Sequence, residues 1–120
     1  TNGVYKGKNG VVVLPITEIV TTNEFFDFDA KYKGESDEIT PADLTPELES
    51  AIKAETKRIY ELLDLEGICR ADYILQNNEP YLIEINAVPG MSGESLIPQM
   101  AAYQGIDLKD MLSEVIQLKI

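Results

Sequence analysis

Two neighbouring segments of the chain carry polar side chains whose types and spacing could bind a divalent metal ion. In the first, Arg70 and Asp72 are separated by one residue, and in the second the same spacing separates Glu84 and Asn86. If both segments are β-strands, side chains alternate between faces, so each pair lies on one face of its strand. The two carboxylates and the carboxamide would then supply the oxygen ligands that magnesium prefers.

The other face of the two segments is mostly apolar and consists of Ala71, Tyr73, Leu75, Tyr81, Ile83 and Ile85. Burying these side chains would gather the four polar groups on the opposite face, with the two carboxylates directly opposed and the guanidinium opposite the carboxamide. Paired residues in a regular antiparallel ladder have a constant index sum, so this register requires a loop of odd length, either 77–79 or 76–80. A two-residue turn at Asn77–Asn78 would scatter the four groups over both faces.

Directly opposed carboxylates repel each other unless a cation lies between them. A magnesium ion held by Asp72, Glu84 and the amide oxygen of Asn86 would relieve this repulsion, and magnesium often binds beside nucleotide phosphates. The alternative is a network of salt bridges among Arg70, Asp72 and Glu84 on a solvated sheet face. The spacing alone favours neither interpretation.

A glycine-containing turn follows the second segment and leads into a short helix. Gly90 and Gly93 permit close approach of the backbone, and Ser95 and Leu96 stand where free N–H groups point out of a helix N-terminus. This arrangement suits a carboxylate or a phosphate. By itself, the segment favours an ordinary turn before a capped helix.

The hydrophobic pattern predicts a scaffold for these groups. We expect a strand and a tight turn within residues 1–10, a strand at 11–16 that continues to Val20, and strands at 68–75 and 81–86. Pro15 lacks a backbone N–H, so its strand should lie at a sheet edge or carry a bulge. Residues 24–43 are aromatic and acidic, and we expect them to form a long surface loop.

Helices complete the expected fold. Thr45 as N-cap and Pro46 in the first turn predict a helix over 46–63, with an apolar stripe of Leu48, Ile52, Ile59 and Leu63 that Glu55 interrupts. Ser95 can cap a short helix through Tyr103, and Asp107 can cap a last helix with Leu108, Met111, Leu112, Val115 and Ile116 on one face. We therefore expect a single α+β domain over 1–120, mainly an antiparallel sheet with packed helices.

The composition excludes several classes of function. The 120 residues carry a net charge of −11, which disfavours binding to nucleic acid or to an anionic membrane. The absence of histidine excludes Ser-His-Asp and Cys-His catalysis and histidine-bound metals. Cys69 is the only cysteine and is expected to be a buried packing residue. No segment has the length of a membrane span or the form of a signal peptide, so we expect a cytoplasmic protein.

Several segments together resemble the C-terminal signature of the D-alanine–D-alanine ligases, which are ATP-grasp enzymes. These segments are Arg70–Asp72, Glu84–Asn86, Pro89–Met91 and Ser95–Pro98, and Phe25–Tyr32 is similar to the start of the mobile loop that these ligases close over the active site. The Arg-x-Asp and Glu-x-Asn pairs alone indicate an ATP-grasp enzyme, and the Pro-Gly-Met and Ser-Leu motifs narrow the resemblance to these ligases. It covers nearly the whole chain and implies the C-terminal lobe of an ATP-grasp domain.

The resemblance implies roles for individual residues. These ligases phosphorylate the carboxylate of one D-alanine with ATP, and the amine of a second D-alanine then attacks the acyl phosphate. Asp72 and Glu84 would hold one magnesium or manganese ion beside ATP, and Glu84 with Asn86 would hold a second. Arg70 and the backbone N–H of Gly90 would stabilise the acyl phosphate and the tetrahedral oxyanion.

The remaining implied roles concern the second substrate and the mobile loop. Ser95 and the backbone N–H of Leu96 would hold the carboxylate of the second D-alanine. Lys31 would reach the transferring phosphate of ATP, and Tyr32 would help to exclude water. Two positions depart from the family: Phe26 stands where many relatives have Tyr, and Ala87 stands where Thr, Ser or Pro is usual.

The family's phosphate-binding lysine, adenine-contacting strands and N-terminal domain would precede this segment. We therefore expect the chain to be the C-terminal third of a ligase, to need the missing N-terminal and central portions as partners, and to be inactive alone; a homodimer is compatible with the resemblance. Two alternatives stay open. One is an ATP-grasp ligase with D-lactate or D-serine as acceptor, and the other is a noncatalytic acidic interaction module that binds a metal such as calcium.

Overall fold

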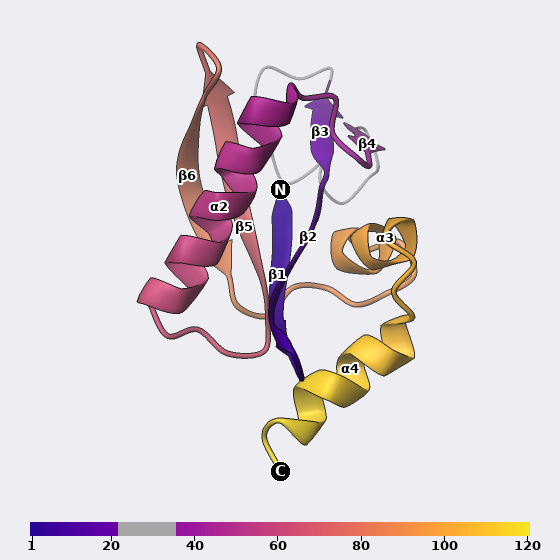
Figure 1. Cartoon of the computed structure of the whole chain (residues 1–120). Coiled ribbons are helices and arrows are strands. Elements are labelled where there is room, and N and C mark those ends of the chain that lie inside the picture. The colour runs from indigo at the N-terminus through magenta and orange to yellow at the C-terminus, as the bar shows by residue number, and fades with distance from the viewer. Residues whose placement is uncertain (22–35) are drawn as a thin grey trace.

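The computed structural model describes residues 1–21 and 36–120, which form two antiparallel sheets and three helices (Figure 1). The larger sheet has the strand order β2-β1-β5-β6, with β1 at Asn2–Gly7, β2 at Gly10–Ile16, β5 at Ile68–Gln76 and β6 at Glu79–Asn86. Neighbouring strands in this sheet run antiparallel. The expected α+β class, a mainly antiparallel sheet with packed helices, is confirmed.

Pro15 lies on an edge strand, as its missing N–H requires. β2 pairs only with β1, and the register shifts between Asn2↔Ile16 and Val4↔Val13, so β2 carries an irregularity around Pro15. Both parts of the expectation hold, because an edge strand needs hydrogen bonds on only one side and a bulge releases one more.

The strand after Pro15 is shorter than the pattern predicts. Instead of one strand continuing to Val20, a separate strand, β3 (Glu18–Thr21), begins after Thr17 and pairs with β4 (Ser36–Ile39). The expected loop at 24–43 is therefore wrong for residues 36–39, and residues 22–35 lie outside the described part of the chain. The prediction missed β4 because its acidic side chains are exposed, so the segment lacks the apolar alternation that marks a strand.

Helix α2 (Pro46–Leu62) confirms the predicted helix almost to its ends. The Thr45 hydroxyl oxygen accepts a hydrogen bond from the Leu48 N–H at 3.2 Å, which is the expected N-cap. The buried stripe differs, since it consists of Ile52, Thr56, Ile59 and Tyr60, whereas the Leu63 side chain is 58% exposed. Leu63 follows the last helical residue as the C-cap, so its side chain leaves the stripe.

The core lies on both faces of the larger sheet. On one face Tyr60 of α2 packs with Val4 and Cys69, and on the other α3 (Leu96–Tyr103) and α4 (Leu108–Gln117) pack against the sheet (Figure 1). Side chains that alternate along each strand therefore enter different clusters. None of the helices in the described part of the chain is both long and apolar enough to cross a membrane.

The second face of the sheet is packed closely against α3. A methyl group placed on Gly3 would lie 2.5 Å from Cδ1 of Ile97 in α3 and 2.9 Å from Cδ1 of Leu14 in β2, so a larger residue at this position would displace both side chains. Ile97, Leu14 and Met100 are fully buried. The side-chain oxygen of Asp107 accepts from the Lys109 N–H at 2.8 Å, which confirms Asp107 as the cap of α4.

Candidate functional site

The four polar groups predicted to share one face come from the paired strands β5 and β6. Asp72 is paired with Glu84, and Arg70 is paired with Asn86, so the predicted register is confirmed for these residues. Directly opposed residues of an antiparallel pair project to the same face. The two carboxylates, the guanidinium and the carboxamide therefore belong to one face of the sheet.

The turn that joins the strands differs from the prediction. It contains two residues, Asn77 and Asn78, with φ of +54° and +62°, as in a type I′ hairpin turn, so neither odd-length loop forms. The paired residue numbers sum to 155 from Gln76↔Glu79 to Tyr73↔Leu82 and to 156 from Asp72↔Glu84 onward. One extra residue in β6, Ile83, forms a β-bulge that changes the register and keeps the four groups on one face.

Arg70 and Asp72 form a bidentate ion pair on this face. Nε of Arg70 donates to Oδ1 of Asp72 at 2.9 Å and Nη2 donates to Oδ2 at 3.1 Å, with side chains 8% and 14% exposed. The structure therefore contains the Arg70–Asp72 part of the salt-bridge network that the alternative interpretation predicts. Glu84 is exposed and has no ion pair with the described residues, so its carboxylate stands open to a ligand.

Asn86 ends β6 and holds the start of the following loop. Its side-chain oxygen accepts from the Val88 N–H at 3.0 Å, a contact that fixes the orientation of the carboxamide. Within residues 1–21 and 36–120 no group of three His, Cys, Asp or Glu side chains could hold a metal ion. A metal at this face would therefore take two carboxylates and one carboxamide from the protein and its other ligands from water or phosphate.

The opposite face of the hairpin is only partly buried, which corrects one expectation. Ala71 is fully buried, Tyr73 and Ile85 are half-buried, and Leu75 is 42% exposed. Tyr81, also expected on this face, instead pairs with Ile74 on the face of Asp72 and is 52% exposed, and the bulge residue Ile83 is 57% exposed. α2 follows this face of the hairpin: its Thr56 meets Tyr73, and near its start Leu48 and Ala51 line a pocket with Asn78 and Pro80 of the turn region.

The loop from Gly90 to Leu96 is shaped around Ser95. The hydroxyl oxygen of Ser95 accepts from the Ser92 N–H at 3.0 Å and lies 2.8 Å from the Ser92 hydroxyl, so Ser95 holds the N-cap position of α3 without capping it by its side chain. A methyl group on Gly90 would lie 2.8 Å from Oγ of Ser95. Gly90 and Ser95 therefore lie close together, as the anion-site interpretation requires.

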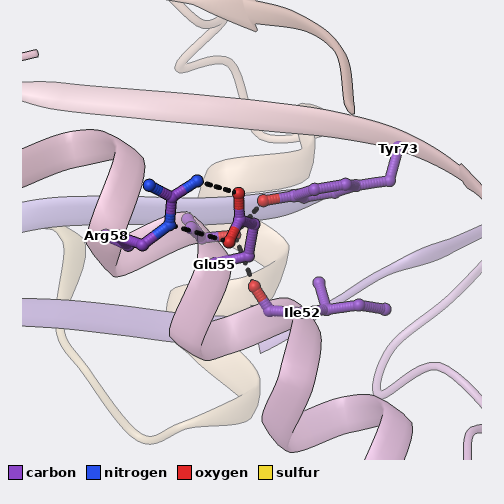
Figure 2. Close-up of polar contacts among 5 residues, drawn as sticks. Ile52, Glu55, Arg58 and Tyr73 are labelled. Atoms are coloured by element: carbon purple, nitrogen blue, oxygen red, sulfur yellow. Dashed lines mark hydrogen bonds and ion pairs between the residues drawn. The ribbon is translucent and has the colours of Figure 1, made fainter. Parts of the chain in front are cut away.

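One contact beside the site was not predicted. The Tyr73 hydroxyl lies 2.8 Å from the Thr56 hydroxyl of α2, and Thr56 donates to the Ile52 carbonyl oxygen at 3.0 Å (Figure 2). Burial raises the pKa of Tyr73, and its hydrogen bond with Thr56 opposes that shift. Thr56 is a polar residue at an i+4 position in the apolar stripe after Ile52, a signal that could have pointed to a buried contact.

Comparison with known proteins decides the family. The sequence profile described as the C-terminus of D-ala D-ala ligase matches residues 2–117. The chain belongs to the D-alanine–D-alanine ligase family. It is 51% identical over 118 residues to a D-alanine–D-alanine ligase from Parabacteroides distasonis, a match that covers 98% of this chain and 36% of the relative. The chain thus spans little more than a third of the length of the ligases it matches.

Solved ligase structures have the same fold. A D-alanine–D-alanine ligase from Bacillus anthracis in complex with ATP superposes with a TM-score of 0.75 at 31% identity, over 97% of this chain and 37% of that one. A D-Ala:D-Ser ligase from Enterococcus faecalis gives a TM-score of 0.79 at 27% identity, over 99% of this chain and 35% of that one. The expected likeness to ATP-dependent ligases is confirmed at the level of sequence and fold.

The remaining expectations concern the loop residues of the ligase resemblance and the single cysteine. Lys31 and Tyr32 lie outside the described residues, as does the aromatic segment around Phe26. Cys69 is 1% exposed and packs with Val4 and Tyr60, so it is a buried packing residue as expected.

Proposed function

We propose that this chain forms the C-terminal part of a D-alanine–D-alanine ligase, which joins two D-alanines at the expense of ATP for peptidoglycan precursor synthesis. The observation that carries the proposal is the pairing of Asp72 with Glu84 and of Arg70 with Asn86 on one sheet face, within a chain of this family. Because the reaction consumes ATP, we expect the ligase to act in the cytoplasm.

The donor set on this face fits hard divalent cations. Asp72, Glu84 and the Asn86 carboxamide offer oxygen atoms only, and Glu84 is exposed to incoming ligands. We propose that Asp72 and Glu84 would hold one magnesium or manganese ion and that Glu84 and Asn86 would hold a second, with water or phosphate oxygens as the other ligands. Such ions neutralise phosphate charge during phosphoryl transfer.

Arg70 is a cation on this face that the chain itself supplies. Two hydrogen bonds to Asp72 fix the orientation of its guanidinium, and its side chain is 8% exposed. We assign to it the stabilisation of negative charge on the acyl phosphate and on the tetrahedral oxyanion, with the Gly90 N–H as a second donor. A donor fixed before the reaction stabilises developing charge without the cost of reorganisation.

Ser95 and the Leu96 N–H at the start of α3 are assigned to the carboxylate of the second D-alanine. The closeness of Gly90 to Ser95 supports this assignment, because both substrates must meet where the acyl phosphate is attacked. By family resemblance, Lys31 contacts the transferring phosphate and Tyr32 excludes water when the loop closes. The rest of the ligase, absent from this chain, supplies the other ATP contacts.

A chimera tests the function directly. This chain replaces the matching 36% of the Parabacteroides distasonis ligase, and D-alanyl-D-alanine formation is measured with ATP and magnesium. We expect activity in the chimera and a loss of at least about a hundredfold in Glu84→Gln, as when one group that acts on transition-state charge is removed. Glu79→Gln, at the other end of β6, is the matched control and should stay active.

A folded chimera without dipeptide formation would contradict the proposal. Equal activity of Glu84→Gln and Glu79→Gln would contradict the assignment of Glu84 as a metal ligand. The 120-residue chain alone should form no dipeptide and release no phosphate from ATP; phosphate release by the isolated chain would contradict the need for the missing portions.

A second candidate concerns the acceptor. The likeness to a D-Ala:D-Ser ligase keeps D-serine as a candidate second substrate. Supplying the chimera with D-alanine, D-serine and D-lactate in competition, at several pH values, separates the acceptors by the products formed. The interaction-module alternative predicts no product and no loss of magnesium binding in Glu84→Gln.

A further inference from the structure

The bulge in β6 determines on which face of the sheet Glu84 lies. If the register of the turn continued regularly past Tyr73↔Leu82, Asp72 would pair with Ile83 and Ala71 would pair with Glu84. Glu84 would then project to the face of Ala71, which is fully buried where α2 packs. The bulge therefore brings Glu84 to the side of Asp72, and both acids lie beside it.

A bulge is also a weak point of the ladder. It leaves one residue unpaired and interrupts the regular hydrogen bonds between strands, so the backbone there depends more on contacts from outside the sheet. The face of β5 that meets α2 becomes more exposed toward the turn, since Ala71 is fully buried, Tyr73 is half-buried and Leu75 is 42% exposed.

Tyr73 supplies such an outside contact. It follows Asp72 directly, lies at the bulge, and projects to the α2 face, where its hydroxyl is 2.8 Å from that of Thr56 (Figure 2). The single hydroxyl hydrogen of Thr56 is donated to the Ile52 carbonyl, so Tyr73 is the donor in the contact with Thr56. Thr56 is 1% exposed and sits in the middle of α2, a rigid partner.

The contact has no substitute nearby. Within the described part of the chain, it is the only side-chain hydrogen bond between α2 and the β5–β6 hairpin. Glu55 and Arg58, the neighbours of Thr56 on α2, instead pair with each other on the exposed side of the helix (Figure 2).

We infer that Tyr73 is a positioning residue of the metal face: its hydrogen bond to Thr56 anchors β5 at the bulge and so holds Asp72 opposite Glu84. The metal-binding consequence rests on the proposed function, whereas the anchoring of the bulge does not. Tyr73 itself contacts neither metal nor substrate, since it lies on the other face of the strand.

The first test measures the bulge without any metal. Amide hydrogen exchange is followed by NMR in the chain and by mass spectrometry in the chimera, for Tyr73→Phe, Thr56→Val, Thr56→Ser and Tyr81→Phe. Loss of one net hydrogen bond should raise local exchange at Ala71–Tyr73 and Leu82–Ile85 about two- to tenfold in Tyr73→Phe and Thr56→Val. Thr56→Ser keeps a hydroxyl and should exchange as the parent does.

Tyr81→Phe is the matched control. It removes the hydroxyl of a tyrosine in the same hairpin, whose only hydrogen bond to another described residue is the one it donates to the exposed Glu79 carboxylate at 3.2 Å, and exchange should stay unchanged. Parent-like exchange in Tyr73→Phe overturns the inference. An equal rise at β1–β2 also overturns it, because Tyr73 would then support the fold as a whole and not the bulge.

The second test measures the metal face with Mn²⁺, which broadens NMR signals of nearby amides. We expect broadening at Asp72 and Glu84 in the parent, and a dissociation constant for Mn²⁺ raised about two- to tenfold in Tyr73→Phe but not in Thr56→Ser or Tyr81→Phe. An unchanged constant in Tyr73→Phe overturns the inference. No broadening in the parent contradicts the metal assignment of the proposed function, while the exchange data still decide the role of Tyr73.

Discussion

Two ion pairs of the same geometry but different burial permit a sharp test of how the Arg70–Asp72 pair acts. Arg70 and Asp72 are joined at 2.9 and 3.1 Å, with side chains 8% and 14% exposed. Arg58 and Glu55 of α2 are likewise joined through Nε and Nη2, at 3.0 and 2.6 Å, but their side chains are 61% and 38% exposed (Figure 2). Burial is therefore the main variable that separates them.

The magnitude follows from what each single substitution leaves behind. Asp72→Asn leaves the buried Arg70 guanidinium without a counter-charge, and removing one partner of a buried pair costs about 3–5 kcal/mol. Because Asp72 keeps some exposure, we expect about 3 kcal/mol for the single variant and a coupling energy of about 2 kcal/mol in a double-mutant cycle with Arg70→Met. Water solvates either partner of the Arg58–Glu55 pair, so that coupling should be close to the error of the measurement.

The assay is urea unfolding at low and high salt, which gives the free energy of unfolding of each variant. One cycle consists of Arg70→Met, Asp72→Asn and their double variant, and the other consists of Arg58→Met, Glu55→Gln and their double variant. Salt should abolish any coupling of the exposed pair and leave that of the buried pair nearly unchanged, because buried charges are screened much less. Equal coupling energies in the two cycles would refute the reasoning, and so would a coupling energy of Arg70 and Asp72 that high salt removes. Either result would mean that Arg70 and Asp72 interact as an ordinary exposed ion pair does.

Three further outcomes are expected. Gly3→Ala should destabilise the fold by about 1–3 kcal/mol, since the new methyl group meets buried side chains, whereas Gly93→Ala, which faces open space, should stay within about 0.5 kcal/mol in the same urea titration. Burial raises the pKa of the Cys69 thiol, so a thiol reagent at pH 8 should label the native protein far more slowly than the urea-unfolded chain. The hydrogen bond from Arg58 lowers the pKa of Glu55, so its small stabilising effect exists at neutral pH and is lost as the pH falls through that lowered pKa; an NMR pH titration should therefore give Glu55 a higher pKa in Arg58→Met than in the parent.

The parts of the fold that could be predicted are those in which local signals agree. In α2, the cap at Thr45, Pro46 in the first turn and the apolar spacing all indicate one helix, and the helix ends within a residue of the predicted bounds. The edge position of β2 was likewise predicted correctly from Pro15, because its missing N–H is a constraint that no tertiary contact removes.

The parts that were missed depend on partners far away in the sequence. β4 is a strand because β3 offers it backbone hydrogen bonds, and its acidic, exposed side chains carry no sign of that pairing. Thr56 is buried because Tyr73 reaches it across the interface between helix and sheet, and a single polar residue within an apolar stripe does not identify its partner. Propensity and periodicity describe one segment at a time, so contacts between segments escape them.

The hairpin joins both lessons, since the predicted opposition of Asp72 and Glu84 is confirmed while the odd-length loop inferred from a regular ladder is wrong. Asn77–Asn78 suits a two-residue turn with positive φ, and the polar pattern requires Asp72 opposite Glu84; a regular ladder cannot satisfy both. The run Tyr81-Leu82-Ile83 breaks the alternation of a strand and marks where the extra residue is accommodated. The opposition of the two acids therefore depends on an irregularity in the ladder, which is why a side chain on the far face, that of Tyr73, can influence it.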